Sequence, residues 1–498
     1  MRMTESAYID DSLKMGSDEP EHSDIAEFYN GCNVLVTDSS DFVNKLTIEK
    51  LLRSCPKLQK LFILVKPKLG VPYKDRLTST FNDPLYTRLR HERADFKSHV
   101  TLIDGDTAAS ELGLSSTSRD FLRKNIHVVI HKPASARRDE KLRRAVDVNV
   151  AAVKSMLQLA AEMSYLKAFV YVSSAFAHYP NQYVNERFYD SRKSAENVMS
   201  LVKVLDDNLL NCLASKIIGR WPDATTFCQC LAEEVVQNYG SRLPTCIVRS
   251  GITLSTYKEP TCGYVDESHE ITMSLASAAL GVVRVLNIDG DCTAEVVPAD
   301  FVVNNVLAAA WDVNRNWNTS KHRIVMGEME PTIYNCVSSC QKAINWNGFV
   351  QLNLKFASEE PSMRTFWYHY LILVNRRWLY KVYTVLLHSL PVSITDAFTQ
   401  PADKNFKLSK TYEKIHKASD AFAYYGSKQW VFGNNNVSKL WKKMNLVDRK
   451  KFDFSVEEFD WEEYMQYYTR TLRVGLFKDP MSTLRQARRR YQRMKIAH

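Results

Sequence analysis

Short apolar runs that favour β-strands alternate with amphipathic helical segments between residues 33 and 313. Such alternation is typical of a parallel sheet whose crossover helices pack on both faces. The pattern therefore predicts an α/β fold built on a Rossmann-type, doubly wound parallel sheet. The expected strands end at Thr37, Lys66, Asp104, His131, Ser174 and Ser250, and the expected helices cover residues 42–53, 138–162 and 224–238.

The pattern changes after Arg323. The rest of the chain is rich in Trp and Tyr and has helical periodicity, so no further strand is expected there. We therefore predict a polar N-terminal tail over residues 1–24, a Rossmann-type domain over 25–325, and a mostly helical C-terminal domain over 326–498 that ends in a basic tail.

The charge distribution argues against a nucleic-acid partner. The formal net charge is +10, but six basic residues fall within the last fourteen positions, so the body of the chain is nearly balanced. A tail of this kind is typical of a solvated terminus, and a patch for nucleic acid or anionic lipid is the alternative.

Two features of the sequence concern its cellular location. The first 24 residues lack the apolar core of a signal peptide, and the ten cysteines have no disulfide-framework spacing, which predicts a protein facing the cytosol. No stretch reaches the roughly 20 apolar residues that a membrane span needs. From Trp367 to Phe398, aromatic and aliphatic residues are interrupted by basic ones. This composition suits peripheral contact with a membrane, or an amphipathic helix pair buried against its own domain.

The first predicted strand leads into an unusual turn. Asn33 to Thr37 reads NVLVT and precedes an amphipathic helix, an arrangement in which a dinucleotide-binding turn carries glycine at fixed offsets. Here those offsets hold Asp38, Asp41 and Asn44. Glycine is also scarce in the chain as a whole, with 16 residues against the roughly 35 that average usage would give.

Several collinear blocks carry a resemblance to a known family. They include RRAVDVNV, FVYVSSAF, LAEEVV, VVPADFVVN and the C-terminal run TYEKIHKASDAFAYYGSKQWVFGNNNVSKLW. With these blocks the chain resembles the alcohol-forming fatty acyl-CoA reductases, which are extended short-chain dehydrogenases. The resemblance implies an NAD(P)-binding domain, NADPH as cofactor and long-chain acyl-CoA as substrate, reduced to fatty alcohol.

The family's phosphate turn reads TGxxGxxG, and only Thr37 of that pattern survives here. Glycines allow the backbone to approach the diphosphate, whose charge the helix N-terminus attracts. Asp38 and Asp41 are instead expected to cap the helix themselves and to repel a phosphate. A shifted turn that binds the nucleotide in a changed pose is the alternative.

The resemblance also locates the catalytic positions. The family's tyrosine and lysine fall on Thr225 and Gln229, whereas its strand-end hydroxyl and its helix asparagine match Ser174 and Asn149. The reaction needs a phenol as proton donor and an ammonium that acidifies it, and threonine and glutamine supply neither. A second match to the Tyr-x-x-x-Lys pattern, at Tyr424 and Lys428, lies in the C-terminal region and is interpreted as a coincidence on a helix surface.

Other cofactor positions are mixed. Lys66 stands where the family keeps a basic residue for the 2′-phosphate of NADPH, and Asp106 matches its adenine-side acid; surface charges at strand ends are the alternative for both. Lys132, Pro133 and Arg138 replace small or apolar residues that line the cofactor. The segment HEITMSLASAALG carries helix formers where the family has a glycine-rich loop. A closed substrate loop is one explanation of this replacement, and sequence drift is the other.

These observations predict a fatty acyl-CoA reductase fold that has lost catalysis, a pseudoenzyme of lipid metabolism. Its expected partners are a fatty acyl chain or acyl-CoA and an active reductase paralogue, with peripheral attachment to the cytosolic face of the endoplasmic reticulum or peroxisome. An active NADPH-dependent reductase with an unorthodox site is the competing hypothesis. A membrane-surface scaffold is the third.

Overall fold

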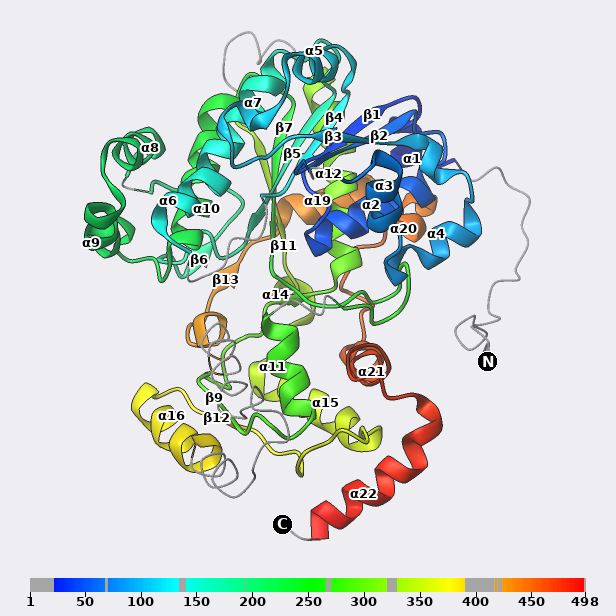
Figure 1. Ribbon diagram of the computed structural model, residues 1–498, viewed down its shortest axis with the longest axis vertical. Coiled ribbons are helices and arrows are strands. Elements are labelled where there is room, and N and C mark those ends of the chain that lie inside the picture. Colours follow the sequence, from blue (N-terminus) through cyan, green and yellow to red (C-terminus); the bar gives the residue numbers. More distant parts are fainter. Residues whose placement is uncertain are drawn as a thin grey trace.

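A computed structural model describes residues 22–67, 70–133, 140–191, 193–265, 270–319, 329–389, 416, 419 and 423–496 (Figure 1). Its upper lobe contains a seven-stranded parallel sheet in the order β11-β7-β5-β4-β1-β2-β3. The strands are β1 (Asn33–Val36), β2 (Lys60–Val65), β3 (Val100–Asp104), β4 (Val128–His131), β5 (Ala168–Ser174), β7 (Thr245–Ser250) and β11 (Thr332–Cys336).

This topology confirms the predicted doubly wound sheet and six of its strands. The chain winds outward from β1 in both directions, so the strand order reverses between β1 and β4. Successive residues of β1 point to opposite faces, and accordingly Val34 and Val36 belong to one buried cluster while Leu35 belongs to the other. The sheet is therefore buried on both sides, as parallel sheets are.

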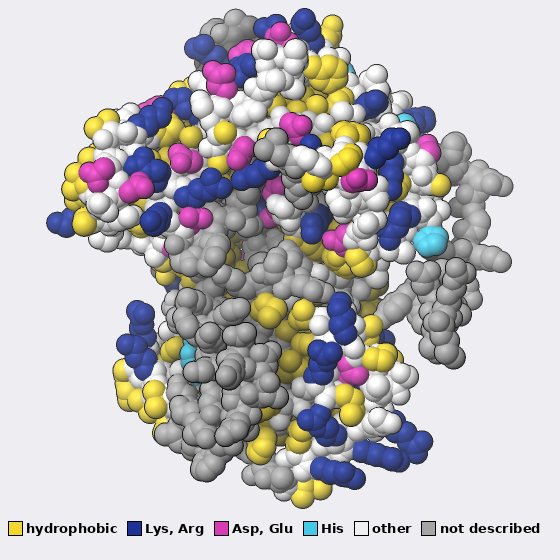
Figure 2. Space-filling model, viewed as in Figure 1, with side chains coloured by type: hydrophobic (Ala, Val, Ile, Leu, Met, Phe, Trp, Pro, Cys, Tyr) yellow, Lys and Arg dark blue, Asp and Glu magenta, His cyan; other side chains and the backbone are white. Residues whose placement is uncertain are grey.

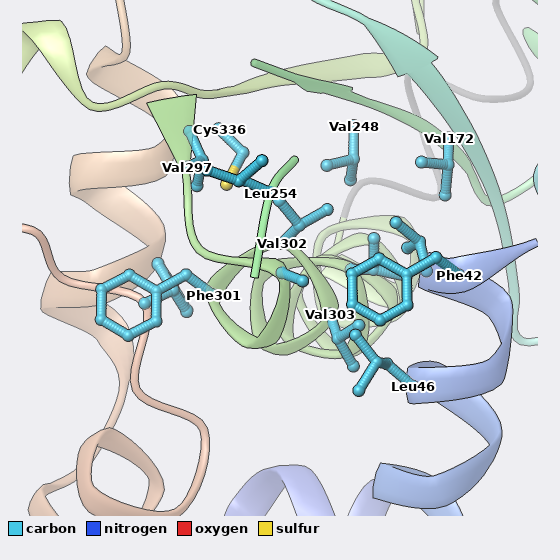
Figure 3. Close-up of a cluster of buried hydrophobic side chains, with 14 of the residues drawn as sticks. Phe42, Leu46, Val172, Val248, Leu254, Val297, Phe301, Val302, Val303 and Cys336 are labelled. Carbon is cyan, nitrogen blue, oxygen red and sulfur yellow. The ribbon is translucent and has the colours of Figure 1, made fainter. Parts of the chain in front are cut away.

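Helices cover each face of the sheet. On one face α2 (Phe42–Ser54) and α12 (Ala299–Thr319) pack together, and Figure 3 shows Phe42 and Leu46 meeting Val303 close to Val172 and Val248 of the sheet. On the other face α7 (Ala152–Ala161) packs against α10 (Ala224–Gly240). The helices up to α12 are α1 (Asp24–Phe28), α2 (Phe42–Ser54), α3 (Tyr73–Thr80), α4 (Thr87–Glu92), α5 (Ser116–Asn125), α6 (Leu142–Ala145), the π-helical η4 (Val146–Ala151), α7 (Ala152–Ala161), α8 (Ala195–Val204), α9 (Asp207–Ile218), α10 (Ala224–Gly240), α11 (Glu270–Ala279) and α12 (Ala299–Thr319).

The expectation that no strand follows Arg323 is wrong. β11 pairs with β7 from Thr332 to Cys336 and forms one edge of the main sheet. Its sequence, TIYNC, is short and nearly half polar, so it lacks the apolar run of a central strand. Asn335 is nonetheless buried, because its side-chain amide donates to the carbonyl oxygens of Val184 (3.1 Å) and Gly433 (2.8 Å). A domain division at residue 325 therefore separates β11 from its own sheet.

The lower lobe is mostly helical and is formed by α11 together with later segments (Figure 1). The later helices are α14 (Ser339–Lys342), α15 (Trp346–Glu359), α16 (Arg377–Thr384), the π-helical η5 (Val385–Ser389), α19 (Asn435–Lys443), α20 (Leu446–Lys451), α21 (Trp461–Thr471), the π-helical η6 (Leu472–Leu476) and α22 (Leu484–Ile496). Of these, α19 and α20 lie in the upper lobe, where α19 contacts β11 and α12. Short parallel pairs join β6 (Tyr183–Val184) to β13 (Val431–Phe432), β8 (Ile252–Thr253) to β10 (Val296–Val297), and β9 (Val285–Leu286) to β12 (Ile372–Leu373).

Three further expectations concern these parts of the chain. The segment of helix formers that replaces a glycine-rich loop is indeed helical, as α11. Arg138, where a helix was expected to begin, and the N-terminal tail as far as residue 21 lie outside the described residues. Within the described part of the chain, no helix is both long enough and apolar enough to pass through a bilayer.

Candidate functional site

The carboxyl ends of the parallel strands bring most of the predicted site residues to one edge of the sheet. Thr37 follows β1, Lys66 follows β2, Asp106 follows β3 and Ser174 ends β5. A cavity of about 340 Å³ opens at the β1–β2–β3 side of this edge. Its lining includes Thr37, Asp38, Ser40, Lys66, Arg76 and Thr107.

Asp41 occupies the N-terminus of the helix that follows β1. It is the N-cap residue of α2, and its carboxylate accepts hydrogen bonds from the backbone N–H groups of Val43 (2.9 Å) and Asn44 (3.4 Å). The Nζ of Lys132, from the loop after β4, lies 2.5 Å from the Asp41 Oδ2. The Asp41 side chain is only 7% exposed. A carboxylate of the chain itself, neutralised by a lysine, therefore sits where a helix terminus attracts anions.

The other two replaced glycine positions behave differently. Asp38 folds onto its own turn, since its carboxylate accepts from the backbone N–H (2.9 Å) and the hydroxyl of Ser40. Asn44 is completely buried, and its side-chain amide has no hydrogen-bond partner among the described residues. Removing such an unpaired polar group from water is unfavourable by about 1–3 kcal/mol. The expected self-capping of α2 thus comes from Asp41, and Asp38 caps a local turn instead.

Two ion pairs flank the cavity. Lys66 lies 3.3 Å from Asp106, and Arg76 lies 2.5 Å from Asp104. On its inner side the Thr37 hydroxyl lies 2.8 Å from Nδ1 of buried His131. Burial lowers the pKa of His131 to about 3, so the imidazole is neutral and can accept this hydrogen bond. The structure thus pairs Lys66 with Asp106 at the edge of the cavity, and this ion pair does not distinguish the cofactor roles from surface charges at strand ends.

The four catalytic positions lie on β5 and on two helices that pack together, α10 and the π-helical η4. Ser174 accepts a hydrogen bond from the backbone N–H of Phe176 (3.2 Å), and Asn149 donates to the carbonyl oxygen of Ala145 (2.9 Å). Thr225 is buried one turn before Gln229 on α10. α10 contacts both η4 and β5, so the structure brings together the elements that carry the four predicted positions, but α10 has neither a phenol nor an ammonium at these two positions.

A buried charge cluster lies beside Ser174 and was not anticipated. The Glu233 carboxylate accepts from the Ser173 hydroxyl (2.6 Å) and from Arg249 (2.6 Å), and lies 2.8 Å from His178 Nε2. Burial alone would raise the pKa of Glu233, but the charge of Arg249 and the hydrogen bonds from Arg249 and His178 hold it well below its usual range. The acid of LAEEVV and the arginine of IVRS were the available signals, but sequence alone does not show that they meet.

The second Tyr-x-x-x-Lys match was expected on a helix surface, and the structure shows that this expectation is wrong. Tyr424 is buried, and its hydroxyl lies 3.3 Å from the hydroxyl of Thr226, the neighbour of Thr225. Lys428 donates to the carbonyl oxygens of Tyr179 (2.5 Å) and Asn181 (3.1 Å). Long-range packing therefore brings this segment against the start of α10, although almost 200 residues separate them in sequence.

The described residues contain no group of three or more His, Cys, Asp or Glu side chains that could hold a metal ion.

Comparisons with known proteins agree with this architecture. Two family models match the chain, and both are described as male sterility protein. The first is of the NAD-binding type and matches residues 36–306, and the second matches residues 387–479. The chain is 34% identical to fatty acyl-CoA reductase wat of Drosophila melanogaster over 98% of this chain and 93% of the relative. It is 31% identical to fatty acyl-CoA reductase 1 of Gallus gallus over 95% and 90% of the two chains.

Solved structures support the fold. The terminal R domain of the myxalamid PKS-NRPS pathway superposes with a TM-score of 0.58 at 14% identity, covering 91% of this chain and 93% of that one. The reductase domain of a nonribosomal peptide synthetase from Mycobacterium tuberculosis superposes with a TM-score of 0.56 at 15% identity, covering 91% and 96%.

Proposed function

Because this chain belongs to the fatty acyl-CoA reductase family, we propose that it serves lipid metabolism by binding a fatty acyl group or another protein, without reducing acyl-CoA. Its oxidoreductase fold includes an NAD-binding type of domain. The family reaction would draw hydride from NADPH bound at the turn after β1. Our proposal is that this copy does not bind NADPH there.

The observation that carries the proposal is the Asp41 carboxylate at the N-terminus of α2. It accepts the backbone N–H groups that a diphosphate would need, and Lys132 already neutralises it. Without Lys132, a phosphate oxygen about 4 Å from this carboxylate would be repelled by about 1 kcal/mol in water and by about 4 kcal/mol at an effective dielectric constant of 20. The lysine offsets part of this repulsion, but the N–H groups remain occupied. The residues present therefore do not fit a dianionic diphosphate.

Proton transfer supports the same conclusion independently. A positioned general acid contributes about 10²- to 10⁴-fold to the rate of such reactions. Thr225 is a far weaker acid than a phenol, and Gln229 carries no charge that could acidify it. Ser174 remains in place, but a hydroxyl alone cannot replace the missing donor and its activator.

Loss of catalysis leaves binding as the retained role. We propose that the chain holds an acyl chain or acyl-CoA, or associates with an active reductase paralogue. We also propose that it attaches peripherally to the cytosolic face of the endoplasmic reticulum or peroxisome. The packing of Tyr424 against Thr226 and Phe176 is consistent with this role, because it places the C-terminal part of the chain against α10, the helix that carries Thr225 and Gln229.

A direct assay is fatty alcohol formation in cells that express the full chain. We expect the amount of fatty alcohol to match that of cells with an empty vector, while cells expressing an active family member give product at least about 10²-fold above it. The Ser174→Ala variant should be indistinguishable from the unmodified chain. Product above the empty control that disappears in Ser174→Ala would contradict the proposal and establish an unorthodox reductase.

A further inference from the structure

One helix of the lower lobe exposes an apolar stripe. α16 and η5 run continuously from Arg377 to Ser389. Their inner face packs Tyr380 into a small cluster with Val285 and Val374. The outer face carries four large apolar side chains, which are Trp378 (62% exposed), Val382 (45%), Val385 (53%) and Leu386 (54%).

The spacing of these four residues makes them one surface. They follow one another at intervals of four, three and one, so they lie along a single side of the helix. Isolated exposed apolar residues are normal in soluble proteins, whereas a contiguous apolar face usually marks an interaction site. Of the described part of this helix, the Tyr380 side is therefore buried against its own lobe and the opposite side is exposed.

Charge around the stripe indicates the kind of partner. Arg376 and Arg377 lie at the start of the helix, next to Trp378 in sequence, and Lys381 lies beside the stripe; all three are exposed. The sequence from residue 361 to 395 contains no Asp or Glu. Along this stretch of chain the surface is therefore apolar at its centre and its charged side chains are all cationic, which complements a negatively charged layer.

A second cationic helix belongs to the same lobe. α22 packs through Tyr491, whose ring stacks on Tyr368 at 5.7 Å and lies 4.7 Å from the ring of His369. Its exposed side bears Arg485, Arg489 and Arg493. Figure 2 shows Lys and Arg side chains spread over this lower part of the molecule. The basic C-terminal residues therefore form an ordered helix on the lobe that also carries the apolar stripe.

We propose that α16–η5 lies in the surface of an anionic lipid bilayer, with its apolar stripe among the acyl chains and its cations at the headgroups. Interfacial helices have this composition, with tryptophan and aliphatic residues on one side and basic residues beside them. Each Lys or Arg near an anionic surface adds about 1 kcal/mol of attraction. An acidic protein would satisfy the charges but would also need an apolar groove for the stripe.

This inference deepens the membrane attachment proposed above by naming its surface and its lipid charge. It does not depend on the state of the nucleotide site, since α16–η5 belongs to the other lobe. The fatty alcohol assay and a vesicle-binding assay can therefore fail separately.

The test is flotation of the full-length chain with vesicles of phosphatidylcholine containing about 30% phosphatidylserine, compared with pure phosphatidylcholine. We expect the chain to float with the anionic vesicles. We expect Val385→Glu/Leu386→Glu and, separately, Arg376→Glu/Arg377→Glu to reduce the bound fraction about tenfold or more. The matched control is Val204→Glu, because Val204 is 83% exposed on α8 in the upper lobe.

Circular dichroism and the melting temperature establish that each variant is folded before the vesicle comparison. Recovery of the unmodified chain in the soluble fraction with anionic vesicles would overturn the inference. So would equal binding of folded Val385→Glu/Leu386→Glu and the unmodified chain. Capture by an acidic protein without binding to anionic vesicles would also overturn it and identify a protein partner.

Discussion

Replacing Arg249 by methionine is expected to lower the free energy of unfolding by about 3–5 kcal/mol, because the substitution leaves the Glu233 carboxylate buried without its guanidinium. Arg249 is completely buried and Glu233 is 1% exposed. Water therefore cannot replace the lost partner. Urea unfolding followed by circular dichroism measures the change.

The size of this effect follows from the number of contacts that Arg249 makes. Its guanidinium donates to both carboxylate oxygens of Glu233, and also to the backbone carbonyl oxygens of Asn185 (3.0 Å) and Arg187 (3.0 Å). Methionine fills part of the volume but satisfies none of these acceptors. The end of β5, which carries Ser173 and Ser174, should also be less stable, because the Ser173 hydroxyl donates to the Glu233 carboxylate that Arg249 positions.

Two controls separate this account from a simple loss of packing. The double variant Arg249→Met/Glu233→Leu removes both charges and should recover at least half of the lost stability, since replacing a buried ion pair by apolar residues is often nearly neutral. Arg119→Met breaks a partly exposed pair with Glu162 and should change stability by less than about 1 kcal/mol. If Arg249→Met were as mild as Arg119→Met, the described cluster would not be stabilising.

Replacing Asp41 by glycine is expected to increase the affinity for NADPH about tenfold or more. The substitution removes one negative charge, frees the N–H groups of Val43 and Asn44, and leaves Lys132 beside the N-terminus of α2. Each of these changes favours an anion at that helix end. Isothermal titration with NADPH, and with inorganic pyrophosphate as a simpler probe, measures the gain.

The matched control is Asp206→Gly. Asp206 caps α9 in the same way, accepting from the N–H groups of Asn208 (2.9 Å) and Leu209 (3.0 Å). Both substitutions should reduce stability only slightly, because glycine is a tolerated N-cap residue. Only Asp41→Gly should change the affinity for the anion. If the two substitutions changed the affinity for the anion equally, Asp41 would not be the residue that keeps anions from this helix terminus.

Much of the fold could be predicted because the central strands are buried on both faces. VLV, LFILV and FVYV are nearly continuous apolar runs, as such strands must be. β11 escaped prediction because it is an edge strand with polar residues whose burial depends on Asn335 reaching Val184 and Gly433, each about a hundred residues or more away. No local pattern carries that information.

The candidate site could be predicted in its chemistry more than in its contacts. Self-capping by Asp41 follows from an acid placed just before a helix, and Lys132 was already recognised as out of place. Their ion pair could not be foreseen, because it forms between loops after β1 and β4 that lie 91 residues apart. The burial of Tyr424 against Thr226 was missed for the same reason: a motif match reveals spacing along the chain but not the partner across space.

The central claim is that the Asp41 carboxylate occupies the position at which the diphosphate of NADPH would bind. It is tested most directly by titrating the unmodified, full-length protein with NADPH and following nicotinamide fluorescence or heat. The account predicts no saturable signal up to about 1 mM, which corresponds to a binding free energy weaker than about −4 kcal/mol. Saturation at micromolar NADPH would contradict it.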